Sequence, residues 1–385
     1  MKRGALHQLA QRIGAEYAAP NARDVDLQAR FPHEGVNALK AEGALSAFVP
    51  RALGGLGCTM SDLASMCEAL GEHCAATGMV FAMHQIKVAS VVRHSGTSEY
   101  FRAYLEELAT RQLLLASVTS EVGVGGDMRS SICALRREGG AYHLEKAATT
   151  ISYGEHADDL LITARRDADA PANDQLLVLA RRADLVLERT GDWDTLGMRG
   201  TCSAAFNVRT TGRIEQILPE EFATIASHSM VPFSHILWSS LWLGIATGAV
   251  NTARSYVRAE ARKKPGTTPP TAIRVAEAMN ALQVMRAGVT EVVDDCEARM
   301  LGGTEPLSSV GFAMKMNNLK IAASQQVVSI IHQAMQICGI SAYRNDTAYS
   351  LGRPLRDALS ASLMVSNDRI YATNAQLALV LKEHS

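Results

Sequence analysis

The sequence predicts a mostly helical α+β protein in which a small β-rich domain separates two helical domains. Residues 1–114 are rich in Ala and Leu and carry apolar residues at helical spacing. From residue 115 to 213, short β-rich runs alternate with turn residues, and from 214 to 385 the helical pattern returns. A chain of 385 residues exceeds one ordinary core, so we expect these three ranges to form separate domains.

The first range is expected to be an N-terminal helical domain. The segment DLASMCEAL (62–70) carries apolar residues three and four positions apart, and Ser61 is expected to cap this helix. The segment FVPRALGGLG (48–57) contains a proline and three glycines, which interrupt helices. We therefore predict a loop between two helices there.

The middle range is expected to be an antiparallel β-barrel or sandwich. Its apolar runs are short, turn residues separate them, and no helical crossover lies between them. A parallel Rossmann sheet needs such crossovers, so the pattern argues against one. The predicted strands lie within residues 113–119, 159–165, 175–181, 185–189 and 205–209.

The last range is expected to be a C-terminal four-helix bundle. Apolar residues recur at three- and four-residue steps from Val275 to Val292, which gives one helix an apolar stripe. Helix-breaking residues fall at 265–270, at 302–306 and near Gly339, and four long helices fit between these breaks. Helices of this composition suit subunit contacts, and packing within one chain would explain them equally well.

Charge and cysteine content exclude several functional classes. The formal net charge is −1, so no field of one sign favours nucleic acid or an anionic membrane as the main partner. The cysteines number seven and lack C-x-x-C spacing, which argues against a metal site and a disulfide framework. No signal-peptide pattern and no run of ~18 apolar residues is evident, so we expect a cytoplasmic protein.

The strongest local motif is VTSEVGVGGD, residues 118–127. Its glycines let backbone N–H groups approach a ligand closely, and Thr119 and Ser120 add hydroxyl groups that can bond to the polar edge of a ring. A dinucleotide fingerprint would need a third glycine where Met128 stands, and no Walker lysine follows. Taken alone, the motif fits a generic turn and a cofactor loop equally well.

With its neighbours, this motif resembles the flavin-contacting loop T-E-P-G-A-G-S-D of the acyl-CoA dehydrogenase family. The match has one inserted residue, and Val122 replaces the proline of the family. Five other blocks also resemble family segments, in the family's order and at about its spacing. They are FVPRALGGLG (48–57), KAATTISYGEHADDLLITAR (146–165), WDTLGMRGTCSAAFNVR (193–209), LGIATGAVNTARSYV (243–257) and QICGISAYRNDTAYSLGRPLRD (336–357).

The resemblance implies the same order of domains, with FAD bound between the β domain and the bundles of two subunits of a homodimer or homotetramer. It implies dehydrogenation of an acyl thioester, on CoA or a carrier protein, with hydride transfer to flavin N5. An electron-accepting flavoprotein would then take up the electrons. The residues implied to contact FAD are Val118, Thr119, Gly125, Gly126, Thr150 and Ser152, with Asn367 near them and Gln336 and Gly339 facing a neighbouring subunit's FAD.

The catalytic base of the family is absent from its usual positions. The usual glutamate lies nine residues after the arginine of an R-D pair, which here is Arg356, and the count reaches Val365. Some members instead place the glutamate ten residues before the glycine of an L-G pair, and the count back from Gly244 reaches Ser234. Neither side chain can accept the α-proton of a substrate.

Three residues are candidates for a replacement base. His235 adjoins the second family position, Asp368 would lie one helical turn beyond Val365, and His84 lies in an apolar segment, FAMHQIK. A structural role is an alternative for each: a hydrogen-bonded core histidine for His235 and His84, and a surface charge or helix cap for Asp368.

Other departures keep two further functions open. The family tryptophan that covers the flavin is replaced near Ala147 and Ala148, and the segment whose arginine binds the FAD pyrophosphate reads ARKKPGTTPP (261–270). Arg262 or Lys263 would have to substitute for that arginine. These losses fit a flavin-dependent monooxygenase of the same fold, although its usual histidine is missing between Ser360 and Met364. A non-catalytic member of the fold is the remaining alternative.

Overall fold

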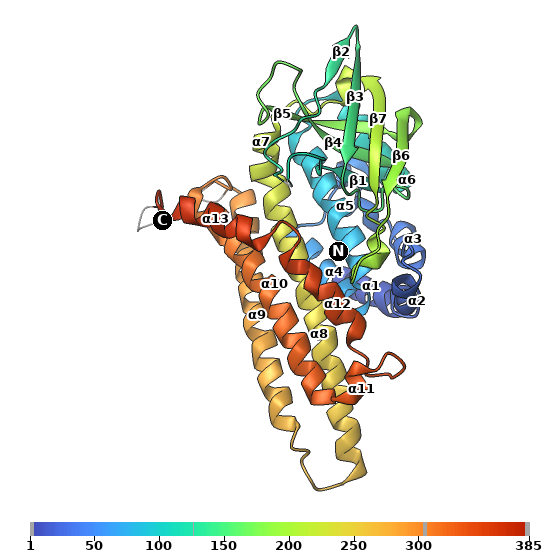
Figure 1. Ribbon diagram of the computed structural model, residues 1–385, viewed down its shortest axis with the longest axis vertical. Helices are drawn as coiled ribbons and strands as arrows, with labels where there is room; N and C mark the ends of the chain where they lie inside the picture. The colour runs from blue at the N-terminus through green and yellow to red at the C-terminus, as the bar shows by residue number, and fades with distance from the viewer. Residues whose placement is uncertain (1–3, 126, 303–305, 382–385) are drawn as a thin grey trace.

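The three predicted regions are visible in the computed structural model, which describes residues 4–125, 127–302 and 306–381 (Figure 1). The strands gather at one end, the long helices run away from them, and the N-terminal helices pack beside their junction. The helices of the N-terminal region are α1 (Ala5–Ile13), α2 (Ala22–Leu27), α3 (His33–Ala41), α4 (Met60–His73), α5 (Ala75–His94) and α6 (Glu99–Arg111).

Helix α4 shows how local sequence and packing act together. Its cap is Thr59 rather than the expected Ser61, because Thr59 and Asp62 form a reciprocal capping box with each other's backbone N–H groups. The helix then packs against α8 (Val231–Lys263). At Gly244 the two backbones approach so closely that an added Cβ would lie 2.0 Å from the carbonyl oxygen of Glu68. Glycine is therefore required at this crossing.

The middle region forms two sheets, as the strand pattern predicted. One contains β1 (Leu115–Val118), β4 (Asp159–Arg165) and β5 (Gln175–Arg181) in the order β1-β4-β5. Strands β4 and β5 are antiparallel, whereas β1 runs parallel to β4, and the chain between these two passes through the other sheet. That second sheet is antiparallel throughout, in the order β2 (Arg136–Glu138), β3 (Ala141–Ala148), β7 (Ala205–Arg213) and β6 (Leu185–Gly191).

The C-terminal region is a bundle whose fourth member is interrupted. After the short α7 (Phe222–Ile225) come three long helices, α8, α9 (Ala272–Met300) and α10 (Val310–Cys338). The chain then turns at Gly339, whose φ of +57° suits glycine. In place of a fourth long helix it forms α11 (Ile340–Tyr343), α12 (Gly352–Leu359) and α13 (Asn367–Ala378), of which α12 packs against α8 and α10.

Two helical segments reach the length and hydropathy that a membrane span needs, contrary to the expectation from the sequence. They are Ala75–His94 and Phe222–Lys263. In both, 89% of the apolar window is buried inside the protein, which is the environment of a core helix.

Candidate functional site

A cavity of about 560 Å³ lies where the β domain, the N-terminal helices and the bundle meet. Hydroxyl side chains of the β domain line part of it, and methionines and other apolar side chains of the helices line the rest. The hydroxyl residues of the β domain are Ser117, Thr119, Ser120, Thr150, Ser152, Thr195, Thr201 and Ser203. The apolar group includes Met79, Met83, Ile86, Met230, Trp238, Leu363, Met364 and Val365.

Hydrogen bonds fix the hydroxyl groups in place. The Ser120 hydroxyl donates to the Thr150 carbonyl oxygen at 2.7 Å and accepts from the Thr150 backbone N–H at 3.1 Å. The Ser203 hydroxyl donates to the Ser152 hydroxyl at 2.8 Å. An isoalloxazine ring has apolar faces and a hydrogen-bonding edge, so these lining groups fit a flavin.

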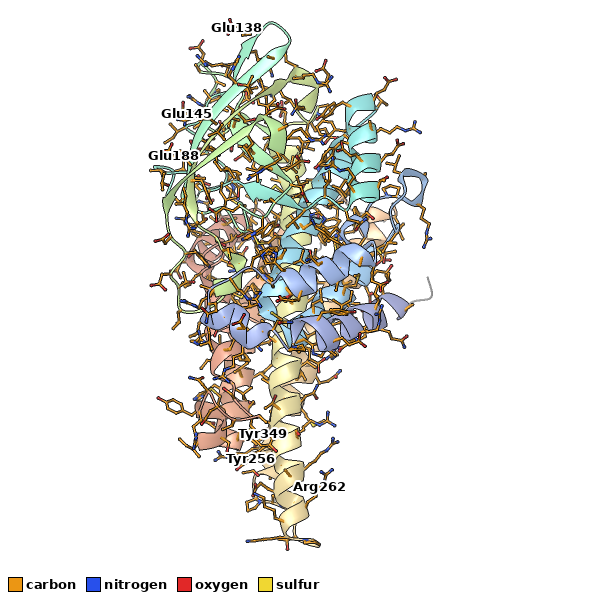
Figure 2. The ribbon with its side chains drawn as sticks, turned by 90° about the vertical axis from the view of Figure 1, so that its right-hand side faces the viewer. Glu138, Glu145, Glu188, Tyr256, Arg262 and Tyr349 are labelled. Atoms are coloured by element: carbon orange, nitrogen blue, oxygen red, sulfur yellow. The ribbon has the colours of Figure 1, made fainter. Side chains whose placement is uncertain are left out.

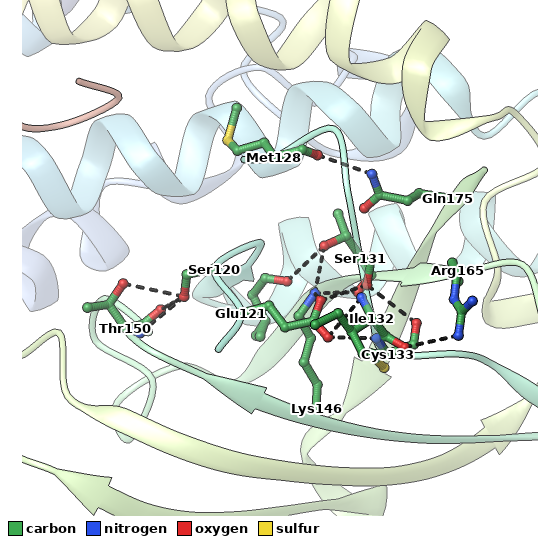
Figure 3. Close-up of polar contacts among 12 residues, drawn as sticks. Ser120, Glu121, Met128, Ser131, Ile132, Cys133, Lys146, Thr150, Arg165 and Gln175 are labelled. Carbon is green, nitrogen blue, oxygen red and sulfur yellow. Dashed lines mark hydrogen bonds and ion pairs between the residues drawn. The ribbon is translucent and has the colours of Figure 1, made fainter. Parts of the chain in front are cut away.

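Within the glycine-rich motif, Glu121 is buried and contacts residues 131–133 and Lys146 (Figure 3). Glu121 is 6% exposed and accepts from the backbone N–H groups of Cys133 at 2.6 Å and Ile132 at 3.1 Å. It also accepts from the Ser131 hydroxyl at 2.7 Å and pairs with the ammonium group of Lys146 at 3.3 Å. Because a buried charge without partners would be costly, this network fixes Glu121, near the start of the motif, against residues 131–133.

Of the residues predicted to contact the flavin from the loop and its neighbouring turn, some line the cavity and others do not. Thr119 faces it, as do the predicted Thr150 and Ser152 on the neighbouring turn. Val118 is fully buried at the end of β1 and is absent from the described lining. Gly125 has a φ of +59° and is exposed, and Gly126 lies outside the described residues.

Asn367 does not face the cavity, contrary to prediction. It is 8% exposed and accepts a hydrogen bond from the buried ammonium group of Lys320 at 2.7 Å, while its amide donates to Ser324 at 3.1 Å. Both partners lie on α10, so Asn367 attaches the start of α13 to the bundle. Burial lowers the pKa of Lys320 to about 8.

The residues expected to serve a neighbouring subunit lie far from this cavity in one chain. Gln336 and Gly339 are exposed at the end of α10. Figure 2 shows Arg262 at the far end of the bundle, opposite the tip of the β domain marked by Glu138. Any contact of these residues with a cofactor therefore requires a second chain.

His84 cannot serve as the catalytic base, because both of its ring nitrogens are engaged in the protein interior. It is fully buried, its Nδ1 accepts from the Leu115 backbone N–H at 3.0 Å, and its Nε2 bonds to the Leu45 carbonyl oxygen at 2.7 Å. With one ring nitrogen accepting and the other donating, the imidazole is held neutral. Burial lowers its pKa to about 4. His84 connects α5 to β1 rather than facing a substrate.

His235 lies behind the cavity wall rather than on it. Ser234, directly before it, and Trp238, three positions after it, line the cavity, whereas His235 is 2% exposed and absent from the lining. Its Nε2 has no hydrogen-bond partner among the described residues. Burial, followed by the nearby charge of Lys320, lowers its pKa to about 3, which makes His235 a poor proton acceptor.

Asp368 is exposed in the first turn of α13 and does not line the cavity. The expectation that it would share a helical face with Val365 is wrong, because the helix is interrupted: Val365 has a φ of +46° and α13 begins only at Asn367. The carboxylate instead favours the positive end of the helix dipole. Val365 and Ser234, which occupy the two family base positions, both line the cavity.

Lys87 is the functional candidate that sequence reasoning missed. It follows Met83 by one turn of α5 and lines the cavity, although only 4% of it is exposed. It has no hydrogen bond or ion pair among the described residues, and burial lowers its pKa to about 7. The available signal was a single lysine within a long, mostly apolar helix.

The segment WDTLGMRGT closes another side of the cavity against α12. At Gly197 an added Cβ would lie 2.1 Å from the carbonyl oxygen of Arg356, so the two backbones touch. The buried Asp357 accepts from the Met198 backbone N–H at 2.7 Å, and burial raises its pKa to about 6. Arg356, which also lines the cavity, is paired with Asp26 of α2.

Comparison with known proteins gives consistent family matches. The acyl-CoA dehydrogenase N-terminal domain matches residues 2–112, and the acyl-CoA dehydrogenase C-terminal domain matches residues 229–365. The mitochondrial isovaleryl-CoA dehydrogenase of Arabidopsis thaliana is 25% identical over 351 residues, covering 88% of this chain and 82% of the relative.

Two solved structures show the same fold. FMN-bound TdsC from Paenibacillus sp. A11-2 superposes with a TM-score of 0.82 at 22% identity, covering 97% of both chains. Butyryl-CoA dehydrogenase from Megasphaera elsdenii gives a TM-score of 0.81 at 19% identity, covering 98% of this chain and 97% of the other.

Proposed function

Because this chain belongs to the acyl-CoA dehydrogenase family of flavoenzymes, we propose that it is an FAD-dependent oxidoreductase that desaturates an acyl thioester between Cα and Cβ. The observation that carries the proposal is the cavity, with fixed hydroxyl groups along one part and apolar side chains along another. Such a surface suits a flat ring with a polar edge beside an apolar acyl chain. CoA or a carrier protein would present the thioester, and a flavoprotein would accept the electrons.

The residues of the cavity have distinct tasks in this reaction. Thr119, Thr150 and Ser152 hold the polar edge of the cofactor, and Met79 and Met83 flank the acyl chain and exclude water. A bound flavin supplies the acceptor for the hydride that leaves Cβ. The protein must supply an acceptor for the α-proton, and the two positions that carry it in the family hold Val365 and Ser234.

The proposed assembly is a homodimer or homotetramer in the cytoplasm. Its support is the position of Gln336, Gly339 and Arg262 at the end of the bundle remote from the cavity. In a single chain they have no access to the proposed flavin site, whereas a second copy would bring them to it.

The test is anaerobic mixing of the purified yellow protein with acyl-CoA thioesters of graded chain length and branching. We expect at least one thioester to bleach the flavin absorbance and to yield the α,β-unsaturated product. A colourless protein that takes up no FAD on reconstitution would contradict the proposal and favour a non-catalytic role.

A second candidate is flavin-dependent oxygenation. The observation that favours it is the absence of a carboxylate and an imidazole from the described residues that line the cavity. An oxygenating enzyme does not have to remove an α-proton from a thioester. If no thioester bleaches the flavin, and the chemically reduced protein consumes O₂ rapidly to give an oxygenated product, oxygenation replaces dehydrogenation.

A further inference from the structure

Among the described residues, every buried charged side chain except that of Lys87 has a polar or oppositely charged partner. Among the described residues that carry a charge and are buried, six have a partner of opposite charge or a hydrogen bond: Asp26, Glu121, Lys146, Asp159, Lys320 and Asp357. Lys87 has neither. Buried polar groups in native proteins are nearly always satisfied, so an exception calls for a functional explanation.

Lys87 also differs from the other buried lysines in where its amine lies. Lys146 and Lys320 point into the protein interior, where Glu121 and Asn367 meet them. Lys87 instead reaches the cavity that we assign to flavin and substrate, on the same face of α5 as Met83. An amine at this surface can exchange a proton with whatever occupies the cavity, which is a bound ligand or, when the cavity is empty, solvent.

The other titratable group of the described lining cannot take this role. Arg356 is paired with Asp26 and its guanidinium does not lose a proton under physiological conditions. The two candidate imidazoles, His84 and His235, are absent from the described lining. Lys87 is thus the lining group with a lone pair available for a proton near neutral pH, since burial disfavours its charged form.

We propose that Lys87 is the catalytic base, which replaces the glutamate absent at Val365 and Ser234. The inference rests on the proposed dehydrogenation. In this step the Cα–H bond breaks and its proton forms an N–H bond on the Lys87 amine, while the hydride on Cβ leaves to the flavin and a Cα=Cβ double bond forms. The ammonium group then returns its proton to solvent when the product leaves.

The first test compares bleaching rates in anaerobic rapid mixing, with the thioester that the wild-type protein oxidises. Lys87→Met removes the amine, and Lys87→Arg keeps a cation that cannot accept a proton. The control Arg102→Met removes a cation from the exposed surface of α6, outside the described lining of the cavity. We expect both Lys87 variants to lose about 10²- to 10⁴-fold in rate and Arg102→Met to change little. Wild-type rates in either Lys87 variant would overturn the proposal. So would a loss in Lys87→Met that Lys87→Arg restores, because that pattern shows an anchor for an anionic substrate.

The second test separates the base from a merely structural residue. In Lys87→Ala, small alkylamines added to the buffer should restore bleaching, with a rate that rises with the basicity of the amine. In D₂O, the wild type should also exchange the α-hydrogens of a thioether analogue, in which sulfur replaces Cβ, and Lys87→Met should not. Equal exchange in both proteins refutes the base. If no thioester bleaches the wild type, it is the proposed dehydrogenation that fails.

Discussion

The unpartnered burial of Lys87 predicts that Lys87→Met stabilises the folded protein. Burial lowers the pKa of the amine from 10.5 to about 7, and no charged neighbour contributes to this change. Each pKa unit between the two values corresponds to about 1.36 kcal/mol. Burial of the amine therefore lowers the free energy of unfolding by up to about 5 kcal/mol below pH 7 and by about 4 kcal/mol at pH 7. Methionine fills a similar volume without a charge, so the variant should recover most of this free energy.

The stability advantage of Lys87→Met depends on pH, because the folded and unfolded wild-type proteins bind the Lys87 proton with different affinity. Between pH 7 and pH 10.5 the unfolded chain holds the Lys87 proton and the folded protein does not, so the wild type gains stability as the pH rises through this window. The advantage of Lys87→Met should therefore shrink to about 2 kcal/mol at pH 9. The assay is denaturant or thermal unfolding of both flavin-loaded proteins at pH 7 and pH 9. A variant less stable than the wild type at pH 7, or an advantage that grows with pH, would refute an unpartnered buried amine.

Three other changes test the rest of the site. Glu121→Gln leaves a buried ammonium group unpaired, and we expect a loss of about 3 kcal/mol in unfolding free energy together with lower flavin occupancy. The exposed Glu138→Gln should match the wild type in both measurements. Gly197→Ala places a methyl group against the backbone of α12 and should sharply reduce soluble expression, whereas Gly140→Ala, which has open space around it, should not. His235→Gln should leave the bleaching rate within a few-fold of wild type, and a complete loss would return His235 to the mechanism.

The pattern of the sequence predicted most elements but missed β2 and the longer β3. Strand β3 alternates buried residues with partly or fully exposed ones from Ala141 to Ala148, as a half-buried strand should. One of its inward positions holds Lys146, a residue type that normally lies in solvent, so the alternation is hidden. A lysine can be buried there because it pairs with Glu121, 25 positions earlier by the numbering, and donates to the Thr163 carbonyl oxygen at 2.7 Å.

For the fourth helix of the bundle, the sequence predicted more regular structure than the protein has. Residues after Gly339 were compatible with one long helix, but the chain forms three short ones. Lys320 of α10 donates to the Val365 carbonyl oxygen at 2.9 Å and to Asn367, and these bonds fix the interruption before α13. The interruption in turn exposes Asp368 to solvent and leaves it away from the cavity.

The sequence by itself determined the helix periodicity, the strand-rich middle, the glycine-rich loop and the absence of glutamate at both family positions. Each of these depends on residue types or on neighbours close in the chain, so it can be read in order along the sequence. The tertiary structure alone decided which polar groups share the cavity. Whether His84, His235, Asp368 or Lys87 can take a proton depends on burial and on partners far away in the chain, and only the folded protein brings those together.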